Sequence, residues 1–157
     1  MESLTNKTEQ TFILLKPDSQ QRGYVGRIIS LFEEKGLKLI ALKMVSPGKE
    51  LLETHYQEHK GRGFFNDLIE YMQMAPVIAM VWQGSGVVSC SRKLLGTTEP
   101  KEATIGSIRG DFCLEKGRLV IHGSDSVEAA EREINLWFDK SELVAYSKCD
   151  ESNIFEH

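Results

Sequence analysis

Four short segments of the chain combine apolar, β-branched and aromatic residues as buried or half-buried strands do. They cover residues 11–16, 37–45, 76–82 and 119–122. Helical patterns separate them, so the predicted order is β-α-β-α-α-β-α-β-α. Without the additional helices this order becomes β-α-β-β-α-β, the split βαβ pattern. We therefore expect an α+β fold of the ferredoxin-like type, in which helices pack on a four-stranded antiparallel sheet. A doubly wound fold would need more strands in strict alternation with helices.

Five segments between and after these strands are expected to be helices. In the first, Val25, Ile28, Ile29 and Phe32 recur with the i, i+3, i+4, i+7 spacing of a helix face that packs on a core. The predicted helices are residues 24–35, 49–59, 64–73, 87–95 and 126–138. A long stretch with weak periodicity, residues 96–118, lies before the fourth strand. Long irregular segments inside a compact domain are usually functional or disordered, and apolar anchors within this one favour order.

The length of 157 residues predicts a single domain, residues 1–157, with a flexible segment 1–9 and a polar tail 139–157. The net charge of −4 argues against a dedicated nucleic-acid binder. No apolar run is long enough to cross a membrane. The three cysteines lack CxxC spacing and the opening segment lacks an apolar signal core, so we expect reduced thiols and a cytoplasmic location.

The fourth predicted strand ends on His122, and a Gly123-Ser124 turn follows it. Asp125 or Ser126 can then cap the last main helix. A histidine beside a helix N-terminus is well placed for phosphate chemistry, because free N–H groups and the helix dipole favour anions there. Taken alone, such a histidine is more often a satisfied core or turn residue.

Other candidate residues also have a functional and an ordinary interpretation. Lys16 ends the first strand, where it is either a solvated boundary charge or a cation aimed at an anionic ligand. His55 and His59 have the i, i+4 spacing of a metal-binding pair. The chain has no HExxH motif, so we expect two partly solvated helix histidines. Neither of the common glycine-rich phosphate loops, GxGxxG or GxxxxGK[ST], occurs.

From residue 10 to residue 149 the chain resembles the nucleoside diphosphate kinase family. The resemblance rests on many fragments in family order and spacing: Thr11-Phe12-Ile13, Lys16-Pro17-Asp18, Gln21-Arg22-Gly23, His55-Tyr56, Phe64-Phe65, Val77 to Trp82, Ile108 to Phe112, His122 to Ser126 and Glu133 to Phe138. The strand and turn at His122-Gly123-Ser124-Asp125 are the most specific of them. The resemblance implies that a γ-phosphate passes from a nucleoside triphosphate to a nucleoside diphosphate. It also implies a ping-pong route through a phosphohistidine and a broad nucleotide specificity.

Carried onto this sequence, the resemblance gives each site residue an expected role. His122 would be the nucleophile, Glu133 would fix its tautomer, and Ser124 would support Glu133. Residues that would hold the phosphates are Lys16, which also reaches the ribose, Arg92, Thr98 and Arg109. Tyr56 would place a hydroxyl near the transferred phosphate. Phe64 would stack on the base, with Leu68 nearby.

The chain departs from the family pattern at Leu119, where the family usually has an asparagine that helps to bind the sugar. Leucine cannot form that hydrogen bond. A lost neutral hydrogen bond is worth about 0.5–1.5 kcal/mol, so we predict weaker nucleotide handling but not a loss of catalysis. Smaller departures occur at Ser19, at Ile105-Gly106-Ser107 and near Asn153, and we expect them to alter turn rigidity and the packing of the tail.

The resemblance also predicts partners. Mg²⁺ would be the cofactor and would be carried by the nucleotide phosphates rather than by an all-protein metal site. A homo-oligomer is expected, and the tail 139–157 favours a hexamer over a tetramer because it can pack on a neighbouring subunit. Two alternatives remain. One is a non-catalytic member of the family, which only Leu119 favours; the other is a nucleic-acid binder, which would need a basic surface and an RNP-type aromatic pattern.

Overall fold

The sheet has four strands, and each neighbouring pair is antiparallel. The computed structural model describes residues 8–156. The strands are β1 (Gln10–Leu15), β2 (Lys38–Val45), β3 (Val77–Gln83) and β4 (Ile121–Gly123), arranged in the order β2-β3-β1-β4. The predicted α+β fold with a four-stranded antiparallel sheet is therefore confirmed, and the strand order is that of a split βαβ arrangement.

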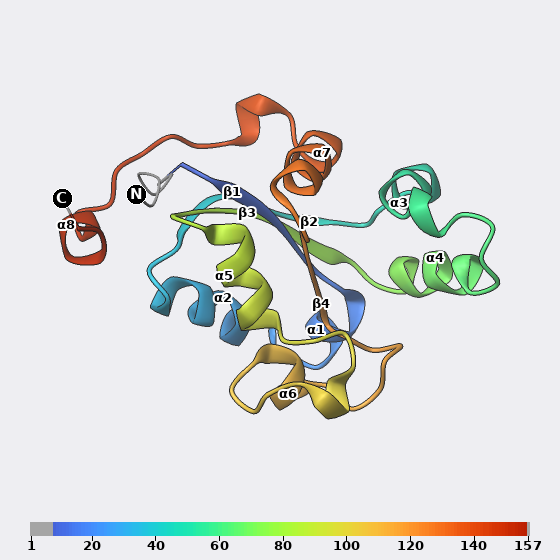
Figure 1. The fold of residues 1–157 in the computed structure, drawn as a ribbon. Coiled ribbons are helices and arrows are strands. Elements are labelled where there is room, and N and C mark those ends of the chain that lie inside the picture. The colour runs from blue at the N-terminus through green and yellow to red at the C-terminus, as the bar shows by residue number, and fades with distance from the viewer. Residues whose placement is uncertain (1–7, 157) are drawn as a thin grey trace.

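Helices cover both faces of this sheet (Figure 1). One face carries α3 (Lys49–His55), α4 (Phe65–Gln73) and α7 (Val127–Trp137), and the other carries α2 (Val25–Glu34), α5 (Val87–Leu95) and α6 (Ile108–Phe112). Strand β1 serves both cores, because successive side chains of a strand point to opposite faces. Phe12 and Leu14 belong to the core under α7, whereas Ile13 and Leu15 belong to the core over α2.

The predicted fourth strand, residues 119–122, was wrong at its start. Val120 has a φ of 56°, the left-handed region that a β-branched residue rarely adopts. The Ile121 N–H donates to the Leu119 carbonyl at 2.6 Å, so a tight turn occupies the first two predicted strand positions. Strand β4 begins only after this turn, at Ile121, and continues one residue beyond His122.

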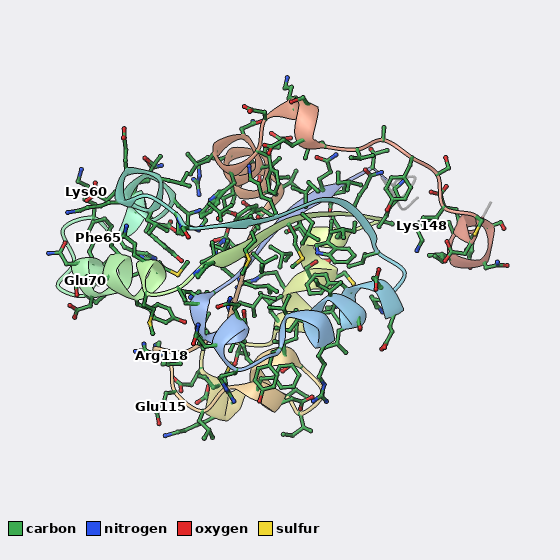
Figure 2. All side chains as sticks on the ribbon, turned by 180° about the vertical axis from the view of Figure 1, so that it is seen from behind. Lys60, Phe65, Glu70, Glu115, Arg118 and Lys148 are labelled. Carbon is green, nitrogen blue, oxygen red and sulfur yellow. The ribbon has the colours of Figure 1, made fainter. Side chains whose placement is uncertain are left out.

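Short helices occupy several positions for which the sequence predicted turns or irregular structure. Helix α1 (Pro17–Gln21) follows β1 directly, because proline fits the first position of a helix. The predicted helix 49–59 divides into α3 and a 3-10 turn, η1 (Gln57–His59). The segment 96–118 contains η2 (Pro100–Glu102) and α6, and Figure 2 labels Glu115 and Arg118 near its end. The guanidinium of Arg118 lies 4.5 Å from the centre of the Tyr71 ring.

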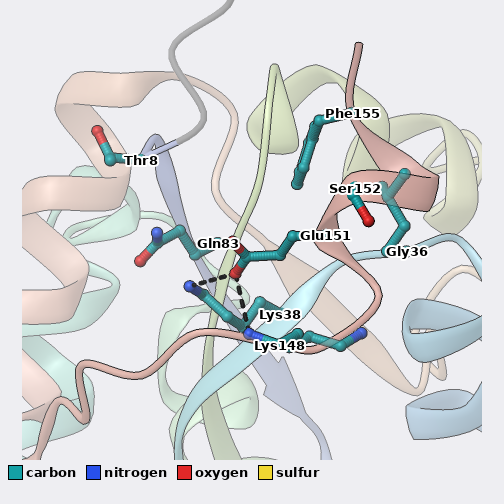
Figure 3. Close-up of a pocket in the computed structure, with 9 residues that line it drawn as sticks. Thr8, Gly36, Lys38, Gln83, Lys148, Glu151, Ser152 and Phe155 are labelled. Carbon is teal, nitrogen blue, oxygen red and sulfur yellow. Dashed lines mark hydrogen bonds and ion pairs between the residues drawn. The ribbon is translucent and has the colours of Figure 1, made fainter. Parts of the chain in front are cut away.

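The C-terminal tail contains η3 (Lys140–Glu142) and α8 (Glu151–Ile154), and it runs beside the edge strand β2. The Val144 N–H donates to the Ile40 carbonyl at 2.9 Å, and the Tyr146 hydroxyl donates to the Leu39 carbonyl at 2.6 Å. Figure 3 shows Glu151 bonded to Lys38 and to the backbone of Lys148, beside a cavity of about 270 Å³. The tail thus has a defined path over this chain.

Most of the predicted flexible segment 1–9 lies outside the described residues. Within them, Glu9 accepts hydrogen bonds from the backbone N–H groups of Gly84 and Val88, both at 3.0 Å. Among the helices of residues 8–156, none has the length and apolar character needed to span a membrane.

Candidate active site

A cleft of about 300 Å³ opens where the ends of β1 and β4 meet α3, α5, α7 and the segment 96–118. Every predicted site residue lines this cleft, except Phe64 and Ser124. The predicted residues that line it are Lys16, Tyr56, Leu68, Arg92, Thr98, Arg109, Leu119, His122 and Glu133. Residues that are up to 117 positions apart in the chain, Lys16 and Glu133, therefore meet at one place.

A chain of hydrogen bonds runs through His122, Glu133 and Ser124. The His122 Nε2 lies 2.6 Å from Glu133 Oε2, and the Ser124 hydroxyl donates to Glu133 Oε1 at 2.6 Å. Burial by itself raises the pKa of Glu133, but the hydrogen bonds from His122 and Ser124 outweigh it and hold that pKa below its usual value. Glu133 is therefore an ionised carboxylate, which only accepts hydrogen bonds, so the His122 proton lies on Nε2. The Nδ1 atom keeps its lone pair.

Local structure fixes the position of His122. Ser126 caps α7, since its Oγ accepts from the Ala129 N–H at 3.0 Å. Glu133 lies on the buried side of this helix, from which it reaches His122. On the other side, the turn at Val120 is held by two bonds. The Val120 N–H donates to Asp18 Oδ2 at 3.0 Å, and the Val120 carbonyl accepts from the Lys16 N–H at 2.8 Å.

Lys16, Arg92 and Arg109 are three of the four cations that line the cleft, and they come from different parts of the chain; the fourth is Arg132. Arg109 is 3% exposed, and its guanidinium donates to the carbonyls of Gly96 and Ile121 at 3.1 and 2.9 Å. Burial and the neighbouring Arg92 lower the pKa of Arg109 to about 10. Burial and Arg109 likewise lower the pKa of Lys16 to about 8. This cluster of like charges needs an anion, and arginine forks match phosphate oxygens.

Tyr56 and Phe64 have different positions relative to the cleft. The Tyr56 side chain is buried, its hydroxyl has no hydrogen-bond partner among the described residues, and burial followed by the charge of Glu133 raises its pKa. An unpartnered buried hydroxyl is costly and is available to a ligand. Phe64 is 48% exposed and packs against His59, which lines the cleft, with 5.4 Å between ring centres. Phe64 therefore lies at the outer edge of the site.

The prediction of two partly solvated helix histidines was wrong for His55. His55 is 5% exposed, and the Trp137 Nε1–H donates to its Nδ1 at 3.1 Å. The helix ends at His55, so His59 lies on the following 3-10 turn and not one helical turn along the same face. The local sequence did indicate that His55 is buried, because Leu51, Leu52 and Tyr56 lie on the same helix face as His55 and are apolar. Other cleft residues that the sequence did not single out are Glu58, Asp125, Ala129 and Arg132.

The charge and geometry of the cleft suit phosphoryl transfer. Cations can bind phosphates, while a histidine held by a carboxylate offers a free nitrogen for attack. The carboxylates at the cleft would fit a Mg²⁺ ion carried by nucleotide phosphates. Both oxygens of Glu133 are already hydrogen-bonded, to His122 and to Ser124. The carboxylates left for the ion are therefore Glu58 and Asp125, which also line the cleft. Mg²⁺ in such sites is held mainly by phosphates, water and one or two carboxylates. Fold and site together define an α+β phosphotransferase.

Comparisons with known proteins name the family. The sequence profile of the family described as "Nucleoside diphosphate kinase" matches residues 9–143. Nucleoside diphosphate kinase A of Homo sapiens is 52% identical over 148 residues, which cover 94% of this chain and 97% of that protein. Nucleoside diphosphate kinase of Drosophila yakuba is also 52% identical over 148 residues and covers 94% and 99% of the two chains. The chain therefore belongs to the nucleoside diphosphate kinase family.

Solved structures agree. The Halobacterium salinarum nucleoside diphosphate kinase in complex with CDP superposes with a TM-score of 0.92, at 40% identity over 95% of this chain and 99% of that one. The Encephalitozoon cuniculi enzyme gives a TM-score of 0.90 at 47% identity, over 94% and 99% of the chains. This chain is thus a nucleotide-binding transferase with nucleoside-diphosphate kinase activity, which passes the terminal phosphate of a nucleoside triphosphate to a nucleoside diphosphate.

Proposed function

We propose that His122 carries the phosphate in this reaction and that the exchange is ping-pong. The observation that supports the proposal most is the bonded chain of His122, Glu133 and Ser124 beside the three cations. The lone pair of Nδ1 forms a bond to the γ-phosphorus as the bond from that phosphorus to the β,γ-bridging oxygen breaks. The electron pair leaves on the diphosphate, and the second nucleotide reverses the step.

The neighbouring residues supply positioning and charge. Glu133 offsets the positive charge that grows on the imidazole ring, while Lys16, Arg92 and Arg109 offset the charge on the phosphates. The Tyr56 hydroxyl donates a hydrogen bond to the nucleotide or to the transferred phosphate, and the Thr98 hydroxyl donates one to a phosphate. When Mg²⁺ is bound to the nucleotide, it screens the phosphate charge so that His122 can approach.

A stacked base gives the broad nucleotide specificity. Phe64 presents an exposed ring at the edge of the cleft, and Leu68 lines the cleft wall. Stacking on a ring tolerates every base, because each base has a π face. ATP, GTP and their pyrimidine counterparts would all be donors, and the corresponding nucleoside diphosphates would all be acceptors.

The proposal also covers the domain organisation, the assembly and the location of the protein. We propose that the chain is a single domain and that it acts as a hexamer in the cytoplasm. Exposed apolar side chains on β2, Leu42 at 52% and Met44 at 56%, support self-association, because apolar patches mark contact surfaces.

A labelling experiment tests the proposed carrier. The protein is incubated with γ-labelled ATP and Mg²⁺, and free nucleotide is then removed. We expect an acid-labile, base-stable label that added GDP or UDP removes. The matched variant His122→Gln should bind ADP and take up no label. A wild-type protein that binds ADP and never takes up label would show that His122 is not a phosphate carrier.

A further inference from the structure

His55 is a buried titratable residue that the mechanism above does not use. It is the last residue of α3, and its ring lies between the rings of His122 and Trp137. The ring centres of His55 and His122 are 4.8 Å apart at 77°, and those of His55 and Trp137 are 5.6 Å apart at 86°. The Phe12 ring packs against the rings of His55, His122 and Trp137, with 5.6–6.1 Å between ring centres. His55 is therefore held in one orientation beside the nucleophile.

Trp137 determines which nitrogen of His55 carries the proton. The indole Nε1–H can only donate, so Nδ1 of His55 must accept the 3.1 Å bond between them. A neutral His55 ring then has its proton on Nε2. Burial lowers the pKa of His55 to about 3, and the charge of His122 adds to this effect. The charged groups that face it are His122, Glu133, Lys16 and Arg132, and among these only Glu133 opposes the shift.

The protonated nitrogen faces Glu133. His55 Nε2 lies 3.8 Å from Glu133 Oε2, the oxygen that also meets His122, and it has no hydrogen-bond partner among the described residues. At this distance the N–H acts on the carboxylate as an oriented dipole, and a small movement would make a hydrogen bond. Glu133 thus has Ser124 on one oxygen and both histidines on the other.

We propose that His55 is a positioning residue that acts on His122 through Glu133. Its N–H stabilises the ionised carboxylate, and its neutrality leaves the charge of Glu133 for the imidazole that is being phosphorylated. Trp137 keeps His55 in the required tautomer. A cationic His55 would draw Glu133 away from His122 and would repel the phosphorylated ring. This inference rests on the proposed role of His122 as phosphate carrier.

A metal site is the alternative for this cluster, because ligand atoms of His55, His122 and Glu133 lie within 4.8 Å of one another. The Trp137 bond argues against it. A histidine that binds a metal donates its other N–H to an acceptor, but the other nitrogen of His55 meets a donor. The nitrogen that faces the cluster is protonated and offers no lone pair.

Kinetics and pH dependence test the proposal. In His55→Phe the ring remains and the N–H is lost. We expect the single-turnover rate of His122 phosphorylation to fall two- to tenfold, with the nucleotide KM unchanged. The acid limb of the rate–pH profile should move to higher pH, because Glu133 loses a donor that favours its ionised form. His55→Gln retains an N–H donor and should recover part of the rate. A merely structural role would not move the profile.

Trp137→Phe and Trp82→Phe form a matched pair that keeps the test independent of folding. Both indoles are buried, but Trp82 lies in the other core, and its Nε1 has no hydrogen-bond partner among the described residues. Ring ¹⁵N shifts of the wild type should show His55 neutral with an Nε2 proton from pH 5 to 9. Trp137→Phe should mix its tautomers, and Trp82→Phe should leave them unchanged.

The outcomes separate the two proposals. If the wild type takes up no label, the phosphohistidine proposal fails. If the wild type is labelled and His55→Phe has the same rate and pH profile, only the role of His55 is overturned. An Nδ1 proton on His55 in the wild type would also overturn it. So would Zn²⁺ binding that His55→Phe abolishes, since the cluster would then be a metal site.

Discussion

At the scale of single residues, the site depends on one buried carboxylate. Glu133→Gln retains the shape of the side chain and removes its charge. A hydrogen bond to a charged group is worth about 1.5–3 kcal/mol, so we expect the rate of His122 phosphorylation to fall about 10- to 100-fold, as measured by rapid quench with labelled ATP. Glu131→Gln, on the exposed face of the same helix, is the control and should retain the wild-type rate. Equal rates in the two variants would exclude a role for the Glu133 charge.

Lys16 gives the site a pH dependence above neutrality. Its pKa of about 8 means that the ammonium loses its proton in the free enzyme as the pH rises through that value. Nucleotide affinity should therefore fall between about pH 7 and 9. Stability should change in the opposite direction. Between the lowered pKa and the ordinary Lys value of about 10.4, the unfolded chain binds more protons, so the free energy of unfolding rises with pH. Titration calorimetry with ADP checks the affinity, and Lys16→Arg should remove its pH dependence.

Among the predicted departures from the family pattern, Leu119 is the one that lines the cleft. It lines the cleft beside the turn at Val120, and its side chain cannot donate or accept a hydrogen bond. Leu119→Asn should strengthen nucleotide binding about two- to tenfold, the value of one neutral hydrogen bond. The gain should appear with ADP and vanish with an analogue that lacks the ribose hydroxyls. Equal gains with both ligands, or no gain, would show that position 119 does not contact the sugar.

At the scale of elements, Asp18 joins α1 to α4 and to the turn that precedes β4. It accepts from the Val120 N–H and from the Tyr71 hydroxyl. Asp18→Ala leaves both donors buried without a partner, so the free energy of unfolding should fall by about 2–4 kcal/mol. Urea denaturation measures this loss. Asp67→Ala, an exposed residue in the first turn of α4, is the control and should change stability by less than about 0.5 kcal/mol.

The elements also show what the sequence could and could not predict. Strands and long helices followed from apolar periodicity, so β1, β3, α5 and α7 lie within one or two residues of their predicted ranges. The start of β4 could not be predicted from the sequence, because a run of Leu, Val and Ile gives no sign that Val120 has a positive φ. The local apolar pattern favoured a buried His55, but its hydrogen bond to a tryptophan 82 positions away lies outside any local pattern. Sequence resemblance located the cleft residues, whereas tertiary contacts determine the tautomers.

At the scale of the whole molecule, the tail links the edge of the sheet to the proposed oligomer. Removing residues 144–157 deletes the bonds that Val144 and Tyr146 make to β2 and the ion pair of Lys38 with Glu151. An uncovered edge strand exposes N–H and C=O groups. We expect a Tm several degrees lower and, in sedimentation at micromolar concentration, species smaller than the hexamer proposed for the wild type.

The catalytic cleft should survive this truncation, because every residue that lines it lies between positions 16 and 133. The initial label on His122 per chain is therefore expected to match the wild type at low temperature. Tyr146→Phe is the milder variant, since it removes one hydrogen bond to β2 and leaves the remainder of the tail in place. It should lower Tm slightly and retain the hexamer. A truncated protein with unchanged Tm and unchanged mass would show that neither the edge strand nor the oligomer depends on the tail.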